Sequence, residues 1–124
     1  MTTHHDIWHA YATAWSAPQP HRDDLLDRNV GPEVTYRDPT VEVLGRGGLS
    51  DYMHAFQQGF PGYSFAIVAV DAHHDRSLAH WKLHDPDGTP VQDGISHAVH
   101  DASRRLTDIA GFFPIQEPAG VVSR

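Results

Sequence analysis

The feature that most constrains this chain is a change in the spacing of its apolar residues near residue 60. Before that point, apolar side chains recur three and four residues apart, as in Trp8, Tyr11 and Trp15, which is typical of a helix with one buried face. From Tyr63 onwards they alternate, as in YSFAIVAVDA, which is typical of β-strands. Helices followed by a long antiparallel meander predict an α+β domain.

The helical part is expected to contain three helices, over 7–17, over 22–29, and from Ser50 or the glycines before it. Asp6 would cap the first helix, and Gly31-Pro32 would end the second. The extended segments are expected at 34–38, 41–44, 63–72, 78–84, 91–100 and 105–113. After Pro114 the tail from about residue 115 looks loose. A curved sheet around these helices would leave a cone with an apolar cavity.

Length and charge limit the class of protein. The 124 residues suit a single domain. The formal net charge of -7 argues against nucleic acid as a partner, because that role needs clustered Lys and Arg. The chain has no cysteine and no long apolar run, so we expect a cytoplasmic protein with no membrane partner.

The segment VTYRDP carries the most suggestive side chain. Strand alternation places Val34, Tyr36 and Asp38 on one face, with Asp38 where the strand ends and a pocket would open. A carboxylate at the mouth of an apolar cavity could act as a general base. The alternative is that Asp38 bonds local backbone N–H groups or pairs with Arg37 or Arg46.

The order of several motifs resembles the nuclear transport factor 2-like superfamily, in its SnoaL-like polyketide cyclase and ketosteroid isomerase branch. The resemblance covers residues 7–113, through VTYRDP, GRGGLSDYMHAF, PGYSF, HWKLHDPDG and RRLTDIAGFF. It implies a cone-shaped α+β barrel with three N-terminal helices packed on a strongly curved, mostly antiparallel sheet. It also implies a deep pocket, frequent homodimers, and activities that include isomerase, cyclase, dehydratase and epoxide hydrolase.

The resemblance assigns roles to some residues. Asp38 matches the general base of ketosteroid isomerases, and Tyr11 falls close to their oxyanion-stabilising tyrosine. Their late-strand acid corresponds to Ser96 here, so that partner is missing. His100, further along the same strand, is the histidine best suited to acid/base work. For Tyr11 the alternative is ordinary core packing against its aromatic neighbours.

The aromatic residues exceed what a small core needs, so we expect some of them to line a pocket for a small apolar or aromatic ligand. For each residue singly, ordinary core packing is the alternative. With the polar Ser96, the expected ligand-binding residues are Trp15, Tyr36, Tyr52, Phe56, Trp81 and Phe112.

No metal or cofactor is expected. Adjacent strand residues such as His73 and His74 point to opposite faces, and Lys82 separates His80 from His84. GRGG is neither a phosphate-binding loop nor a dinucleotide fingerprint.

Three functions are consistent with these patterns. The first is a cofactor-independent isomerase, cyclase or dehydratase in which Asp38 abstracts a proton. The second is a binding module without catalysis, and the third is an epoxide-hydrolase-like enzyme using Asp108 and Arg46 beside Asp38. In each case we expect a homodimer through the outer sheet face that bears Ile95, His97 and Val99.

Overall fold

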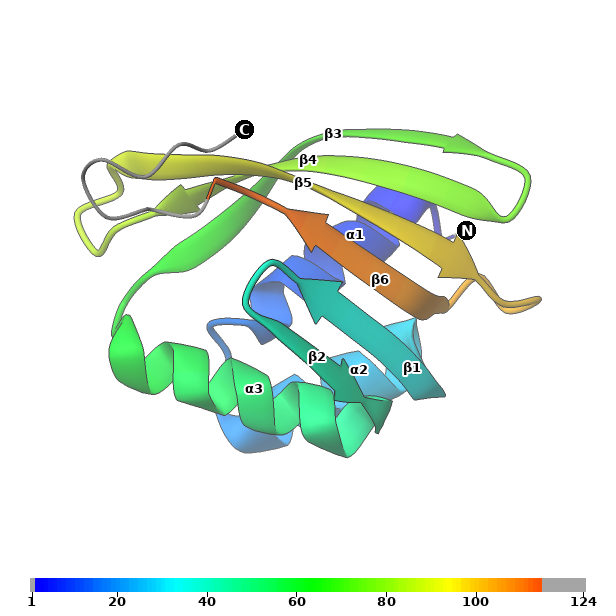
Figure 1. Ribbon diagram of the computed structural model, residues 1–124, viewed down its shortest axis with the longest axis horizontal. Helices are drawn as coiled ribbons and strands as arrows, with labels where there is room; N and C mark the ends of the chain where they lie inside the picture. The colour runs from blue at the N-terminus through cyan, green and yellow to red at the C-terminus, as the bar shows by residue number, and fades with distance from the viewer. Residues whose placement is uncertain (1, 115–124) are drawn as a thin grey trace.

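The structure, a computed structural model, describes residues 2–114 as three helices packed against a curved sheet of six strands (Figure 1). In chain order the elements are α1 His4–Ala14, α2 Gln19–Asn29, β1 Val30–Asp38, β2 Val41–Leu44, α3 Gly45–Gly59, β3 Ser64–His73, β4 Arg76–His84, β5 Pro90–His100 and β6 Leu106–Phe112. The α+β architecture predicted from the spacing of apolar residues is confirmed.

The sheet has the strand order β2-β1-β6-β5-β4-β3. All neighbouring pairs are antiparallel except β1 and β6, which run parallel. Figure 1 shows the sheet bending, so that β3, β4 and β5 extend over α1 while β1 and β2 turn toward α3. The sheet remains open, with β2 and β3 as its edges, so the expected cone does not close into a barrel.

Some element boundaries differ from the expectation. Helix α1 begins at His4 and is capped by Thr3, so the prediction that Asp6 is the cap was wrong. Gly31-Pro32 does not form a break, because β1 already begins at Val30. Helix α3 begins within the glycines, at Gly45, where φ is +77°. The predicted loose tail lies outside the described residues.

The core lies between the helices and the inner sheet face. Its largest fully buried side chains are Trp8, Leu26, Val30, Val34, Leu49, Met53, Leu106 and Ile109. In β4 the side chains of Ala79, Trp81 and Leu83 are buried, and the residues between them are half-buried on the other face, as the alternation predicted. Among the described residues, no helix is long and apolar enough to cross a membrane.

Candidate functional site

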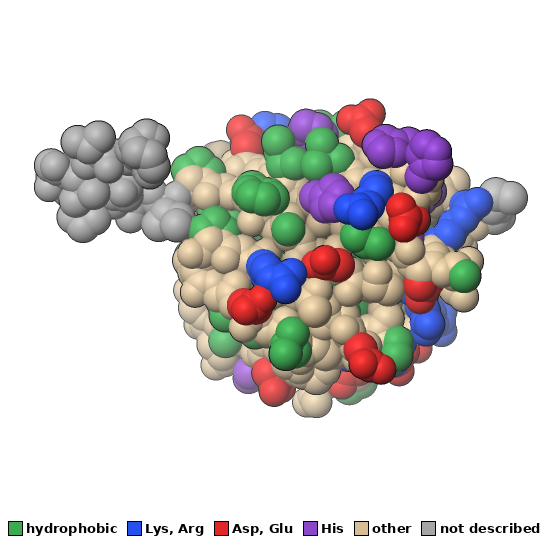
Figure 2. Space-filling view, turned by 45° about the vertical axis from the view of Figure 1, so that its right-hand side comes forward, with side chains coloured by type: hydrophobic (Ala, Val, Ile, Leu, Met, Phe, Trp, Pro, Cys, Tyr) green, Lys and Arg blue, Asp and Glu red, His purple; other side chains and the backbone are tan. Residues whose placement is uncertain are grey.

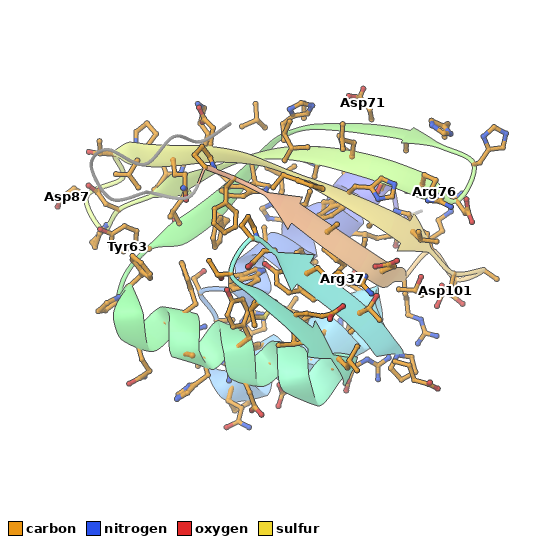
Figure 3. The ribbon with its side chains drawn as sticks, in the orientation of Figure 1. Arg37, Tyr63, Asp71, Arg76, Asp87 and Asp101 are labelled. Atoms are coloured by element: carbon orange, nitrogen blue, oxygen red, sulfur yellow. The ribbon has the colours of Figure 1, made fainter. Side chains whose placement is uncertain are left out.

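The main cavity of the described chain has a volume of about 490 Å³ and lies between α1, α3 and the inner face of the sheet. Most of its wall is aromatic, from Trp8, Tyr11, Trp15, Tyr36, Tyr52, Phe56, Phe60, Tyr63, Phe65, Trp81 and Phe113. Figure 3 shows Tyr63 in the segment that joins α3 to β3. The polar lining residues are Asp38, Thr40, Gln92 and Ser96. A cavity of this size and composition suits a small, largely apolar ligand.

Asp38 ends β1, as predicted, and the turn after it fixes one of its oxygens. Oδ1 accepts hydrogen bonds from the Thr40 backbone N–H, at 2.8 Å, and from Thr40 Oγ1, at 2.9 Å. This short-range arrangement is typical of aspartate in a turn. The expected alternative of local backbone bonding therefore applies to Oδ1.

The second oxygen of Asp38 receives two tyrosine hydroxyls from different elements. Tyr36 of β1 and Tyr52 of α3 donate to Oδ2, at 2.7 and 2.9 Å. Each carboxylate oxygen offers two acceptor positions, so these two phenols and Thr40 together occupy all four. The sequence indicated that Tyr36 and Asp38 share a face, but not that Tyr52 meets them.

No arginine pairs with Asp38, contrary to one alternative considered above. Arg37 of β1, labelled in Figure 3, is not a lining residue of the cavity and pairs with Glu42 and, at 3.2 Å, with Asp108. Arg46 donates to the Val30 carbonyl oxygen at 2.8 Å. Asp108 is also outside the cavity lining, so it cannot be the second carboxylate that an epoxide hydrolase would need.

The tyrosines beside Asp38 are held as neutral phenols. Burial is the main reason that the pKa of Tyr36 rises far above its ordinary value, and Tyr11 and the Asp38 carboxylate raise it further. Burial also raises the pKa of Tyr52, with a further upward effect from Asp38. Both hydroxyls therefore keep their protons at neutral pH and can donate hydrogen bonds.

Tyr11 lies on α1, where it packs in the core and also lines the cavity. Its ring packs edge-to-face between Trp8 and Trp15, with centroid distances of 5.6 and 6.3 Å. The side chain is buried but also lines the cavity. Burial raises the pKa of Tyr11 well above its ordinary value, and the charge of Asp38 adds to the rise. Tyr11 is therefore a neutral phenol in the cavity wall.

The position of Trp15 in the cavity wall is fixed by α3. Gln57 donates from Nε2 to the backbone carbonyl oxygens of Trp15, at 3.0 Å, and Ala17, at 2.8 Å. These bonds hold the end of α1 against α3. The Trp15 ring then contacts Phe56 and Phe65 edge-on, at centroid distances of 5.5 and 5.6 Å.

Ser96 faces the cavity from β5 and lies near Asp38. Its Oγ accepts a hydrogen bond from Trp81 Nε1 at 3.1 Å. Gly111 of β6 is paired with Ser96. A Cβ placed on Gly111 would lie 3.5 Å from Ser96 Oγ, 3.7 Å from Asp38 Cβ and 3.8 Å from the Tyr36 hydroxyl. The absent side chain of Gly111 therefore leaves a small space shared by Ser96, Tyr36 and Asp38.

His100 does not line the cavity, so the structure does not bring this predicted catalytic residue together with Asp38. Its ring nitrogens bond Ser77 Oγ at 2.6 Å and the Arg104 carbonyl oxygen at 2.7 Å. The Trp8 indole also donates to Ser77 Oγ, at 2.8 Å. His100 faces inward like Ser96, but it lies at the far end of β5, where it links strands to α1.

Phe112 was expected to bind ligand but does not line the cavity. It lies on the outer sheet face with 62% of its surface exposed and is paired with Ile95 of β5. Strand alternation turns Ile109 and Gly111 inward and Phe112 outward. The neighbouring Phe113 lines the cavity instead.

The other predicted ligand-binding residues all line the cavity: Trp15, Tyr36, Tyr52, Phe56, Trp81 and Ser96. Lining residues that were not predicted from the sequence include Thr40, Phe65 and Phe113. Alternation along β3 could have indicated Phe65, and the spacing of Asp38 and Thr40 is typical of an aspartate turn. Within residues 2–114, no three His, Asp or Glu side chains are grouped so as to hold a metal ion.

Comparisons with known proteins agree with this fold. The family model of the SnoaL-like domain matches residues 8–104. A candidate isomerase of the SnoaL-like family from Agrobacterium tumefaciens is 28% identical with a TM-score of 0.84, and the match covers 92% of this chain and 99% of that one. Comparison with curated proteins gave no match.

Two further solved structures share the fold at lower identity. A candidate polyketide cyclase from Sinorhizobium meliloti is 18% identical with a TM-score of 0.68, covering 86% of this chain and 93% of that one. A protein with a ketosteroid isomerase-like fold from Catenulispora acidiphila, solved in complex with trimethylamine, is 16% identical with a TM-score of 0.72. The match covers 89% of this chain and 86% of that one.

Proposed function

This chain belongs to the SnoaL-like domain family, and from that premise we propose that it is an acid/base enzyme acting on a small apolar substrate without a cofactor. The reaction class is isomerisation, cyclisation or dehydration through an enolate. The observation that carries the proposal is the placement of Asp38, the only carboxylate among the described lining residues, in the wall of a mostly aromatic cavity. A carboxylate held in position beside a carbon acid in a largely apolar cavity is suited to proton abstraction.

The hydrogen bonds of Asp38 suggest how it would act as a base. All four acceptor positions are filled, so one donor has to move before the carboxylate can take a proton. Tyr52 is the best candidate, because it is only half-buried and its hydroxyl already lies 3.3 Å from a second partner, Thr40 Oγ1. Tyr36 and the Thr40 N–H would continue to hold the carboxylate in place.

The proposed reaction moves one proton through Asp38. Oδ2 of Asp38 takes a proton from a carbon next to the substrate carbonyl, and the C–H electron pair moves to the carbonyl oxygen. The resulting enolate oxygen accepts a hydrogen bond from the displaced Tyr52 hydroxyl, with Tyr11 or Ser96 as a further donor. Asp38 returns its proton to a different carbon in an isomerisation. Neutral phenols suit the donor role because they stabilise charge only as it develops.

The test uses proton exchange, which requires no knowledge of the natural substrate. The protein is incubated in D₂O with a panel of cyclic enones and β-diketones, and loss of the α-proton signal is followed by NMR. Asp38→Asn is expected to lower the catalysed exchange rate by about 100-fold or more. Exchange at the wild-type rate in Asp38→Asn would contradict the proposal.

Asp93→Asn provides the matched control. Asp93 is on the outer sheet face, where its exposed carboxylate pairs with Lys82 at 2.8 Å. Its replacement removes the same charge by the same substitution, so exchange is expected to stay at the wild-type rate. A similar loss in both variants would mean that net charge, not the base, limits exchange.

A binding module without catalysis is the second candidate. The full set of hydrogen bonds on Asp38 favours it, as does Ser96 where family enzymes carry an acid. This function predicts that panel compounds bind in the cavity while their α-protons do not exchange faster than in buffer. The same NMR samples therefore separate the two functions.

A further inference from the structure

The charge of the cavity wall is unbalanced. The described lining residues include one carboxylate, Asp38, and no Lys, Arg or His. Arg37 of β1 and Arg46 of α3 pair with other acidic residues instead of Asp38. The carboxylate of Asp38 therefore has no charged partner among the described lining residues. A cationic ligand would supply the missing charge.

The hydrogen bonds of Asp38 restrict what kind of cation this can be. Both oxygens already accept two donors each, from Tyr36, Tyr52 and Thr40. All of these donors are neutral, so they orient the carboxylate without cancelling its charge. A primary ammonium would need free acceptors for its N–H groups. A quaternary ammonium needs none, and it gains only from charge and from contact with surrounding groups.

The aromatic wall next to Asp38 provides such contacts. The rings of Trp15, Tyr36 and Tyr52 lie against one another, with centroid distances of 5.6 to 5.8 Å. The face of an aromatic ring attracts a cation within about 6 Å, and tryptophan does so most strongly. Phe65 and Trp81 form a further part of the wall, with a centroid distance of 5.1 Å.

We propose that the cavity selects an organic cation, a quaternary ammonium joined to an apolar or aromatic body. The ammonium group lies between the Asp38 carboxylate and the rings of Trp15 and Tyr52, and the body fills the rest of the 490 Å³. This inference rests on the proposed function in that it names the substrate class of the same cavity. A positive nitrogen next to the reacting carbon would stabilise the carbanion. The described cavity wall has no cationic side chain that could do so.

The test compares two probes of nearly equal shape by isothermal titration calorimetry. (4-Hydroxyphenyl)trimethylammonium carries the cation, and 4-tert-butylphenol is its neutral counterpart. The wild-type protein is expected to bind the cation about tenfold more tightly, as charge and cation–π contacts would give together. Hydrophobicity alone predicts the opposite order. Equal or tighter binding of 4-tert-butylphenol, or no binding of either probe at millimolar concentration, would overturn the inference.

Two variants localise the preference. Asp38→Asn is expected to reverse the order of the probes, and its binding of 4-tert-butylphenol would show that the cavity is intact. Asp93→Asn is expected to keep the wild-type preference. If Asp38→Asn does not fold, added NaCl gives the second measurement, because salt weakens binding of the cation and not of the neutral probe. A preference that survives both Asp38→Asn and high salt would overturn the inference.

The outcomes are distinct from those of the proposed function. Proton exchange with no cation preference would remove this inference and leave the proposed function. Cation preference with no exchange for any panel compound would remove the proposed function and leave a cation-binding site.

Discussion

Trp81 and Gly94 show how one missing side chain shapes the cavity. They are directly opposed on β4 and β5. A Cβ on Gly94 would lie 2.0 Å from the nearest carbon of the six-membered part of the Trp81 indole, far inside the closest non-bonded contact that a Cβ makes. The ring therefore lies across Gly94, which lets Nε1 reach Ser96 at 3.1 Å. Glycine is required at this position for close approach, and not for its backbone freedom.

Gly94→Ala is therefore expected to displace Trp81 and destabilise the protein. Overpacking of this kind costs about 1–3 kcal/mol, measurable as a lower free energy of unfolding in urea. The Trp81 indole would also lose its hydrogen bond to Ser96 and change the cavity wall.

Gly47→Ala is the matched control, because a Cβ at Gly47 would meet no atom within 4 Å. Gly47 lies within α3, so alanine there is expected to leave stability unchanged or raise it by up to about 1 kcal/mol. Equal effects of the two substitutions would show that the Trp81 contact does not matter.

At the scale of elements, the start of α1 shows what organises a helix end. Thr3 Oγ1 accepts from the Asp6 backbone N–H at 3.0 Å, and Asp6 Oδ2 accepts from the Thr3 backbone N–H at 3.0 Å. This reciprocal pair is a capping box, which satisfies two backbone donors at once. Asp6 also lies in the first turn, where the helix dipole favours negative charge.

Thr3→Ala removes one half of that box and is expected to lower the free energy of unfolding by about 1 kcal/mol. Thermal and urea unfolding, followed by circular dichroism, would measure the change. Thr2→Ala is the control, because the structure gives the Thr2 side chain no role in the box. If Thr3→Ala unfolds like Thr2→Ala, the capping interaction does not stabilise the domain.

The site itself depends on two elements meeting. Strand β1 supplies Tyr36 and Asp38, and α3 supplies Tyr52, so the fourth hydrogen bond to the carboxylate forms only when α3 packs against β1. The end of α1 is fixed to the same helix through Gln57. Movement of α3 would therefore alter the hydrogen bonds of Asp38 and the position of Trp15 together.

At the scale of the whole molecule, the outer sheet face carries exposed apolar side chains. Val68, Ile95 and Phe112 border a shallow groove there, with 57%, 37% and 62% of their surfaces exposed. Figure 2 shows hydrophobic side chains interspersed with histidine and charged side chains on one face of the molecule. Exposed apolar residues grouped in this way often mark an interface.

We therefore propose that the protein is a homodimer through this face, which includes Ile95, His97 and Val99 as the sequence analysis expected. Phe112 joins them because the structure turns it outward. Sedimentation at neutral pH is expected to show a dimer at micromolar concentration, and Phe112→Ser is expected to shift it toward monomer.

Leu44→Ser serves as the control for that experiment. Leu44 is 69% exposed but lies on β2, at the opposite edge of the sheet from β3. Its replacement is expected to leave the sedimentation coefficient unchanged. A wild-type protein that sediments as a monomer at micromolar concentration would contradict the proposed dimer.

The sequence by itself determined which segments are helices and strands, because that information lies in local spacing. The change of spacing near residue 60, the strand ending at Asp38 and the turns between later strands all follow from neighbours a few residues apart. The same spacing predicted that Trp15, Phe56 and Trp81 face inward. It could not decide which inward residues meet a cavity and which meet the core.

Only the tertiary structure decided what surrounds Asp38, because those contacts depend on strand register and helix packing. Tyr52 is 14 residues from Asp38 in the chain, yet its hydroxyl shares Oδ2 with Tyr36. His100 is buried like Ser96 but lies at the other end of β5. Phe112 and Phe113 are adjacent, and only the register of β6 determines which of them reaches the cavity.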